Sequence, residues 1–234
     1  MLWFSPFAAR PWRRGSPPCS TVGISPAGGQ PGWWYVEDGT ITSENTPARP
    51  RQRGALPDVA RGLPGDFDLR LEFRLVGGNS GIQFRSRELP DWDTSGYQAD
   101  IEDGEQWTGC LFEHTRGGVS MRGEHTVIDP DGTKHVTSLG DPKQLLSHVR
   151  KHEWNTYRIT ARGPEIMLAI NDVVMCRAVD HQTGVAARSG VIALQMHPGP
   201  PMKVQFRNLR IKTFGETSPT SAPARPAPPA TPKP

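Results

Sequence analysis

Alternation of hydrophobic and polar residues dominates the middle of the chain and predicts β-strands. In the stretch 66–76, Leu69, Leu71, Phe73 and Leu75 recur at every second position, with charged residues between them. Because successive side chains of a strand point to opposite faces, this stretch has one apolar and one polar face. The same alternation predicts further strands at residues 82–85, 97–100, 153–162, 165–172, 191–197 and 203–212.

Turn signals separate these runs. The Asp-Gly pair at Asp38-Gly39 and the segment 129–132 favour hairpins, and the glycine-rich segment 77–81 joins two strands. Asp141 as N-cap and proline at the first helical position predict one short helix that continues to residue 149. Many short strands with turns roughly 8–12 residues apart predict an all-β fold, an antiparallel β-sandwich or barrel.

The chain of 234 residues divides into three parts. Residues 31–214 are predicted to form one domain, with a long loop over 46–63. Residues 1–30 contain no apolar run of the length that a secretion signal needs, and they are an uncertain or disordered segment. Residues 215–234 are rich in proline and alanine and form a disordered tail. No apolar stretch approaches the ~20 residues of a transmembrane helix.

Composition and charge exclude some classes of function. With 35% hydrophobic and 22% charged residues, the chain can form a core. A net charge of +3, without a basic run interleaved with aromatic residues, argues against a nucleic-acid partner. The three cysteines lack the paired short spacing of a zinc site. Cys110 and Cys176 form either a disulfide or, as the favoured alternative, two buried free thiols.

The polar faces of the predicted strands carry ionisable and amide side chains. An ordinary solvent-exposed face needs only residues such as lysine, threonine and serine. We therefore interpret them as a candidate site. The residues that qualify are Glu72, Arg74, Gln83, Arg85, Tyr97, Gln98, Asp100, Trp107, Gln195 and His197.

Each of these residues also has a purely structural explanation. Glu72 could form a cross-strand salt bridge with a neighbouring arginine. His197 precedes a proline-rich segment and could only shape a turn, and Asp100 could cap a loop. Tyr97 and Trp107 are as well explained as core or rim residues as they are as platforms for a sugar. The six other histidines have no convergent partners in the sequence, and we expect them on the surface.

Several long motifs resemble one known family. They are WWYVEDGTIT, DFDLRLEFRLVGGNSGIQFRSR, GYQADI, HEWNTYRITARG, IMLAIND and GVIALQMHPGPPMKVQFRNLRIK, in this order between residues 32 and 212. The chain resembles the 3-keto-disaccharide hydrolases. The resemblance implies a concanavalin A-like β-jelly roll, whose concave face receives a sugar, in a secreted or periplasmic protein. The strand that opens the family fold before Trp33 is replaced here by segment 1–30, and loop 46–63 lacks the aromatic residues expected near a sugar.

The activity that the resemblance implies is cleavage of glycosides already oxidised at C3 by a separate oxidoreductase. The C3 carbonyl acidifies the proton on C2, so a base can remove it, the enolate can expel the C1 substituent, and water can add back. Such a site needs a base and a group that stabilises the developing oxyanion. It does not need the two opposed carboxylates of an ordinary glycosidase.

Candidate roles follow from this chemistry. His197 or Asp100 is the base, Arg85 and Gln195 hold the keto oxygen, and Glu72 orients or protonates. Histidine starts from a pKa near ~6.5 and aspartate from ~3.9, so His197 is the preferred base unless burial raises the pKa of Asp100. The predicted substrate-binding set is completed by Gln83, Gln98, Arg74, Tyr97 and Trp107.

Three alternatives stay open. A divalent cation held by Glu72, Asp100 and His197 could replace the arginine as electrophile, although no cofactor is demanded by the spacing. A carbohydrate-binding module without turnover could use the same jelly roll, because one sandwich can carry lectins and enzymes alike. The third alternative is that the chain is a structural module displayed by the proline-rich tail. An enzyme is favoured because the polar faces are ionisable rather than aromatic.

Overall fold

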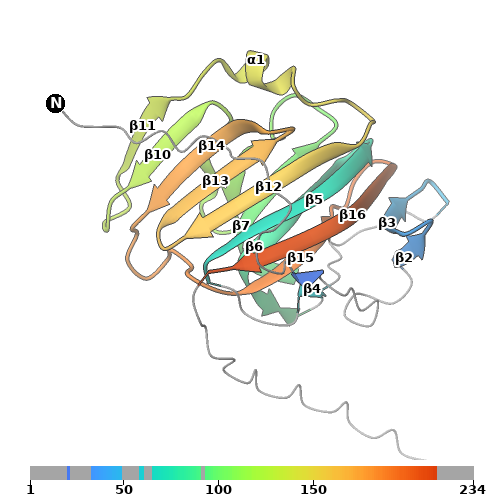
Figure 1. Cartoon of the computed structure of the whole chain (residues 1–234), viewed down its shortest axis with the longest axis horizontal. Helices are drawn as coiled ribbons and strands as arrows, with labels where there is room; N and C mark the ends of the chain where they lie inside the picture. Colours follow the sequence, from blue (N-terminus) through green and yellow to red (C-terminus); the bar gives the residue numbers. More distant parts are fainter. Residues whose placement is uncertain (1–19, 22–32, 49–57, 61–64, 91–92, 215–234) are drawn as a thin grey trace, which may run out of the picture.

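The computed structural model describes residues 20–21, 33–48, 58–60, 65–90 and 93–214. The predictions for segment 1–30, for the tail and for most of loop 46–63 concern residues outside these ranges. Within them the chain is an all-β sandwich of a ten-stranded and a six-stranded sheet, which confirms the predicted fold class (Figure 1).

The larger sheet follows the order β11, β10, β14, β13, β12, β5, β16, β3, β2, and β1 pairs with β16. Neighbouring strands in this sheet are antiparallel, except for β10 and β14, which are parallel. The strands of this sheet are β1 (Ser20–Thr21), β2 (Trp34–Glu37), β3 (Thr40–Asn45), β5 (Phe67–Val76), β10 (Glu124–Ile128), β11 (Lys134–Ser138), β12 (Asn155–Arg162), β13 (Glu165–Ile170), β14 (Val173–Asp180) and β16 (Met202–Thr213).

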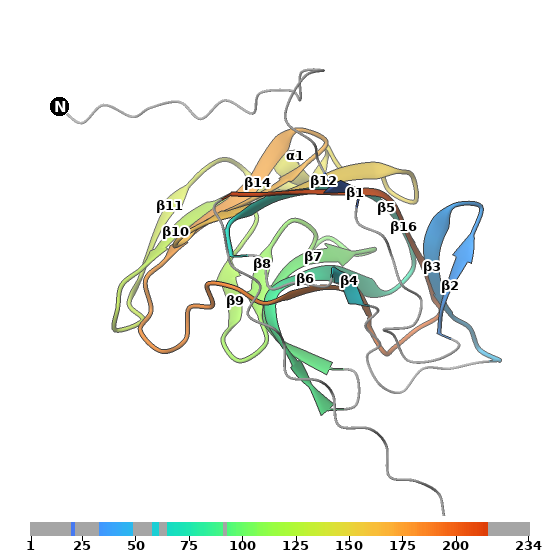
Figure 2. The same ribbon diagram turned by 60° about the horizontal axis from the view of Figure 1, so that its bottom comes forward.

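The smaller sheet follows the order β4, β15, β6, β7, β8, β9 and is antiparallel throughout. Figure 2 shows the ten-stranded sheet arching over it. The strands of this sheet are β4 (Asp58–Ala60), β6 (Asn79–Leu89), β7 (Asp93–Glu102), β8 (Leu111–Glu113), β9 (Gly117–Ser120) and β15 (Val191–Met196).

The apolar faces of both sheets form one core. Leu71 and Phe73 of β5 pack in the same buried cluster as Ile82 of β6, Ile101 of β7 and Leu194 of β15. Burial of this apolar area is the main driving force for closing the sandwich. Since the apolar faces meet inside, the polar faces of the two sheets point to opposite sides of the molecule.

The local predictions hold with small shifts in bounds. Helix α1 spans Pro142–Leu146, shorter than predicted, and the backbone N–H of Gln144 donates to the Asp141 carboxylate at 2.8 Å, as expected for an N-cap. Cys110 and Cys176 are free and buried, so the free-thiol alternative is confirmed. Gly81 lies in β6 rather than in the turn before it. None of the helices in the described ranges is long and apolar enough to span a membrane.

Candidate functional site

Amide and carboxyl side chains gather on the outer face of the six-stranded sheet, where β15, β6 and β7 lie side by side. Gly81 of β6 is paired with Gln195 of β15 on one side and with Asp100 of β7 on the other. One row along, Gln83 of β6 is paired with Gln98 of β7. The pairing of three strands therefore places residues from distant parts of the sequence within one small area.

A chain of hydrogen bonds runs through this area and ends at Asp100. The Ser86 hydroxyl donates to the carbonyl oxygen of the Gln83 amide at 3.2 Å. The Gln83 amide donates to Gln98, and the Gln98 amide donates to Oδ1 of Asp100, both in short buried bonds. Because each amide accepts on one side and donates on the other, the chain holds Asp100 as an acceptor and leaves its second oxygen outside the chain.

Gly81 provides the space for this chain. A Cβ atom at Gly81 would lie 2.6 Å from Cδ of Gln98, closer than side chains pack. A glycine inside a strand usually marks a close approach of another group, and here that group is the Gln98 amide. Gly81 therefore leaves room for the side chain of Gln98 and does not form a turn.

Burial raises the pKa of Asp100 to about 7, and the charge of Glu102 adds to the rise although the hydrogen bond from Gln98 lowers it. Asp100 is 3% exposed. A carboxyl with a pKa near neutrality can take up and release a proton at working pH, as a general base must. Because burial raises the pKa of Asp100, Asp100 is a better base than an ordinary aspartate.

Two further polar side chains extend the area along β15. Oε1 of Gln195 is buried and has no hydrogen-bond partner in the described part of the chain. A buried polar atom without a partner is costly, and a bound ligand or water can satisfy it. His197 follows the end of β15 and is exposed, and its Nδ1 lies 2.5 Å from the carbonyl oxygen of Pro198. Because a carbonyl oxygen can only accept, Nδ1 is the donor in this contact, and Nε2 is the ring nitrogen outside it.

An aromatic pair flanks the same area, with Phe112 on β8 and Trp107 in the segment before it. Phe112 is paired with Gln98, and its ring meets the ring of Trp107 edge to face at 5.8 Å. Both side chains are partly exposed. The backbone N–H of Trp107 donates to Oε2 of Glu102 at 3.0 Å, which ties the aromatic pair to the strand that carries Asp100. Aromatic rings beside polar groups can stack on the apolar face of a sugar.

Glu72 and Arg74 do not lie in this area, and the structure does not bring them together with Asp100 and His197 as predicted. Both lie on β5 in the ten-stranded sheet, and they alternate with the core residues Leu71 and Phe73. Their side chains therefore point away from the six-stranded sheet. Glu72 accepts from Arg207 at 2.7 Å, so its alternative explanation as a cross-strand salt bridge fits the structure.

Arg85 and Tyr97 make their contacts inside the protein rather than in this area. The strand register shifts between Phe84 and Arg87, and Arg85 has a φ of +47°. The bulge turns the buried guanidinium of Arg85 away from Gln83 and toward Gly163, whose carbonyl oxygen accepts at 2.7 Å. The Tyr97 hydroxyl donates to the buried Asp180 at 2.6 Å, so Tyr97 is a core residue. The alternation rule failed here because a bulge adds one residue to the strand.

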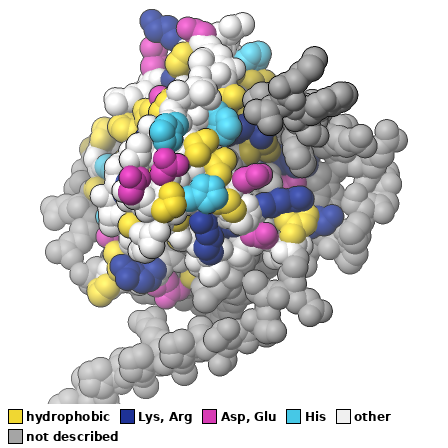
Figure 3. Space-filling view, turned by 90° about the vertical axis from the view of Figure 1, so that its left-hand side faces the viewer, with side chains coloured by type: hydrophobic (Ala, Val, Ile, Leu, Met, Phe, Trp, Pro, Cys, Tyr) yellow, Lys and Arg dark blue, Asp and Glu magenta, His cyan; other side chains and the backbone are white. Residues whose placement is uncertain are grey.

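The predicted metal ligands are not brought together, because Glu72 lies on the opposite side of the sandwich from Asp100 and His197. Within the described ranges, no group of three or more His, Cys, Asp or Glu side chains has the arrangement of a metal site. Figure 3 shows histidine and acidic side chains on the end of the molecule that carries β10 and β11. His135 of β11 contacts Asp129 at 2.7 Å as a simple surface pair.

Sequence reasoning missed Glu102 and Phe112. Glu102 continues the alternation of Gln98 and Asp100 on β7, so the period of two could have included it. Phe112 lies in a strand of three residues, Leu111–Glu113, which is too short for a periodic signal. Its place beside Gln98 follows only from the pairing of β7 and β8.

Comparison with known proteins identifies the relatives of this fold. A family described as the 3-keto-alpha-glucoside-1,2-lyase-like domain matches residues 23–212. No curated protein sequence matches the chain. One similar solved structure is a provisionally named glycosyl hydrolase from Parabacteroides distasonis ATCC 8503. Its TM-score is 0.51 at 19% sequence identity, and the match covers 80% of this chain and 94% of that one.

Two proteins from Bacillus subtilis are also similar in fold. One is a protein of unknown function with a galectin-like fold, at a TM-score of 0.52, 12% identity, and coverage of 80% of this chain and 86% of that one. The other is the carbohydrate binding module CBM66, at a TM-score of 0.49, 13% identity, and coverage of 83% and 95%. At these identities, the structures with a TM-score above 0.5 show the fold alone.

Proposed function

Since this chain belongs to the 3-keto-alpha-glucoside-1,2-lyase-like domain family, we propose that it cleaves glycosides oxidised at C3, with Asp100 as the base. The substrate class comes from the family. The assignment of the base is supported by one observation above all, a buried carboxyl whose pKa is raised to about 7. A separate oxidoreductase supplies the 3-keto substrate, and a secreted or periplasmic location is part of the proposal.

In the proposed reaction, the Asp100 carboxylate removes the proton from C2 of the sugar. The electron pair of the C2–H bond moves toward the C3 carbonyl and forms an enolate, which re-forms the carbonyl as the bond from C1 to the leaving oxygen breaks. Water then adds across the C1–C2 double bond: its oxygen bonds to C1, the proton held by Asp100 returns to C2, and the remaining proton of the water replaces the one given to the leaving oxygen. The sum of these steps is hydrolysis of the glycosidic bond.

The neighbours of Asp100 have matching roles. Gln98 holds the carboxylate in position through its donated hydrogen bond, and Gln195 offers its amide to the sugar. His197, exposed at the end of the same face, is assigned the proton transfer to the leaving oxygen. The rings of Trp107 and Phe112 offer a surface for the sugar or the aglycone.

The test is release of aglycone from a 3-keto aryl glucoside by the wild type, Asp100→Asn and His197→Ala, each with and without EDTA. Asp93→Asn, an exposed carboxyl on the same strand, is the matched control. We expect the control to retain activity and Asp100→Asn to lose about 10²–10⁴-fold in kcat/KM, the usual contribution of a positioned base. Full activity of a folded Asp100→Asn variant would refute the role of Asp100. Loss of activity with EDTA would add a divalent cation to the mechanism.

A non-catalytic carbohydrate-binding module is the second candidate, and the aromatic pair Trp107–Phe112 favours it. A binder would hold unoxidised glycosides on the aromatic pair without turnover. Absence of release from every 3-keto substrate, together with binding of unoxidised glucosides that Trp107→Ala abolishes, would support this candidate.

A further inference from the structure

A pocket with a volume of about 330 Å³ lies on the opposite side of the sandwich, on the outer face of the ten-stranded sheet. Its walls come from β5, β12 and β16 and from the turn between β13 and β14. Apart from the core residue Tyr157, the lining residues with polar side chains are Arg70, Glu72, Thr156, Arg158, Asp172, Asn208 and Arg210. The volume is at the lower end of the range for small-ligand sites, which suits a single sugar unit.

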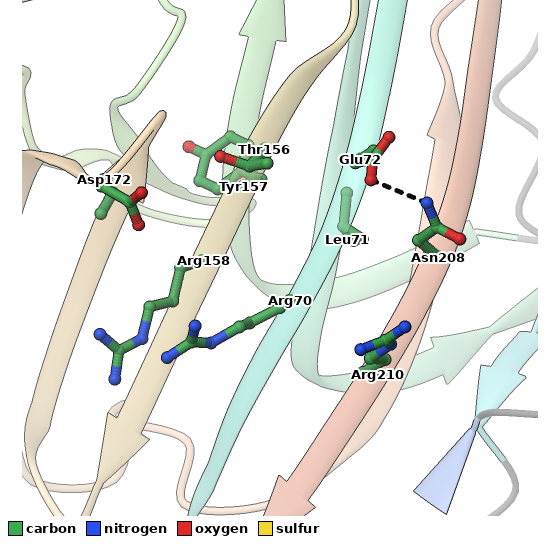
Figure 4. Close-up of a pocket in the computed structure, with 10 residues that line it drawn as sticks. Arg70, Leu71, Glu72, Thr156, Tyr157, Arg158, Asp172, Asn208 and Arg210 are labelled. Atoms are coloured by element: carbon green, nitrogen blue, oxygen red, sulfur yellow. Dashed lines mark hydrogen bonds between the residues drawn. The ribbon is translucent and has the colours of Figure 1, made fainter. Parts of the chain in front are cut away.

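Three arginines form a row across this pocket. Arg70 of β5 is paired with Arg158 of β12 on one side and with Arg210 of β16 on the other. Figure 4 shows this row in the lower part of the pocket, with Asp172, Thr156 and Glu72 above it. Like charges directly opposite one another destabilise a sheet, so three arginines in register need compensation.

Asp68 is an acidic partner of two of these arginines. Its carboxylate, 7% exposed, accepts from Arg158 at 2.7 Å and from Arg70 at 3.3 Å. Asp68 is therefore engaged mainly with the arginine at one end of the row. Arg210, at the other end, is exposed and makes no hydrogen bond or ion pair within the described ranges.

Glu72, the acid nearest to Arg210 on β5, is already engaged. A β-bulge in β16, where Asn208 has a φ of +54°, turns both Arg207 and Asn208 toward Glu72. Arg207 donates to one carboxylate oxygen and Asn208 to the other, each at 2.7 Å. Bulges often re-aim side chains at binding sites, and here the hydrogen bonds to Glu72 come from Arg207 and Asn208 rather than from Arg210, whose charge acts on Glu72 without a hydrogen bond.

We propose that this pocket is a second binding site for an acidic sugar unit, a hexuronate in chemical class. Its carboxylate pairs with the guanidinium of Arg210, beside Arg70, because an arginine fork matches a carboxylate. Its hydroxyls donate to the exposed carboxylate of Asp172 and meet the Thr156 hydroxyl on the opposite wall. The two rows thus fit a ligand that carries one negative charge at one end and hydroxyl groups at the other. The site is independent of Asp100 and of the proposed catalytic activity.

The test is calorimetric titration of the full chain with glucuronate, glucose and sulfate, using the wild type, Arg210→Gln and Arg87→Gln. Arg87 is an exposed arginine on the six-stranded sheet and serves as the matched control. We expect glucuronate to bind the wild type and the control equally, and Arg210→Gln to bind it about tenfold more weakly, as the loss of one charge-assisted hydrogen bond predicts. Glucose and sulfate should each bind more weakly than glucuronate. Turnover of a 3-keto glucoside should be the same in all three proteins.

Three results would overturn the proposal. Equal binding of glucuronate by Arg210→Gln and the wild type would remove Arg210 from the site. Glucose binding as tight as glucuronate would remove the role of the carboxylate. Sulfate binding as tight as glucuronate would reduce the pocket to a site for simple anions. None of these results depends on whether the chain is an enzyme.

Discussion

Replacement of Asp100 by asparagine should stabilise the folded protein at neutral and alkaline pH. The side chain keeps its shape, and its amide oxygen can still accept from Gln98. The gap between a pKa of about 7 in the folded protein and 3.8 for an ordinary carboxyl corresponds to ~4 kcal/mol, at ~1.36 kcal/mol per pH unit. This value is the cost of holding the Asp100 carboxylate ionised in its buried place.

The pH dependence has a definite sign. Below about pH 4 the carboxyl is protonated in the folded and unfolded chain, and the ionisation cost is absent. Between about pH 4 and pH 7 the unfolded chain loses its proton while the folded chain keeps it, so rising pH lowers the free energy of unfolding of the wild type. Above pH 7 both states are ionised and the whole cost is present. The Asp100→Asn variant lacks this term.

Urea unfolding at pH 4, 5, 6, 7 and 8 measures the difference. The free energy of unfolding of Asp100→Asn minus that of the wild type should rise by ~4 kcal/mol between pH 4 and pH 8, mostly between pH 4 and pH 7. Asp93→Asn should follow the wild type at every pH. A difference between Asp100→Asn and the wild type that stays constant from pH 4 to pH 8 would refute the raised pKa of Asp100.

Three further variants test the neighbours of Asp100 and the residues that the structure excludes from the site. Gln98→Leu removes the hydrogen bond that Gln98 donates to Asp100, so the pKa of Asp100 should rise. The acid limb of the plot of kcat/KM against pH should then move up by about one pH unit. An unchanged acid limb would argue against the hydrogen-bond chain of Gln83, Gln98 and Asp100. Arg85→Gln loses its buried hydrogen bonds to the Gly65 and Gly163 carbonyl oxygens. It should therefore lower the free energy of unfolding in urea by ~3 kcal/mol and leave kcat/KM unchanged. A loss of activity in the folded variant would indicate that Arg85 contacts the substrate. Glu72→Gln should leave kcat/KM of the 3-keto substrate unchanged, and a large loss there would contradict the separation of the two polar faces.

Much of the fold was predictable from the period of the sequence. The alternation of Leu69, Leu71 and Phe73 with charged residues predicted β5 and its buried face, and all three side chains are in the core. The Asp141 N-cap likewise placed the start of α1 correctly. These features depend on local chemistry, so the sequence carries them directly.

The candidate site was predictable only in part. Gln83, Gln98 and Asp100 were assigned to one polar face, and the structure brings them into direct contact. Periodicity cannot tell which of two sheets a strand joins, and therefore Glu72 was placed with them although it lies across the core. The bulge at Arg85 reverses the alternation without a signal that can be read from one sequence. The raised pKa of Asp100 depends on its burial, which only the folded chain provides.

The measurement that tests the central claim most directly is the isotope effect at C2 of the sugar. A 3-keto aryl glucoside carrying deuterium at C2 is compared with the ordinary substrate, using the wild type at a pH above the pKa of about 7 of Asp100, and Asp100→Asn alongside. The proposed mechanism predicts slower aglycone release from the deuterated substrate by the wild type and loss of release in the variant. Equal rates for the two substrates, with release retained by folded Asp100→Asn, would contradict removal of the C2 proton by Asp100.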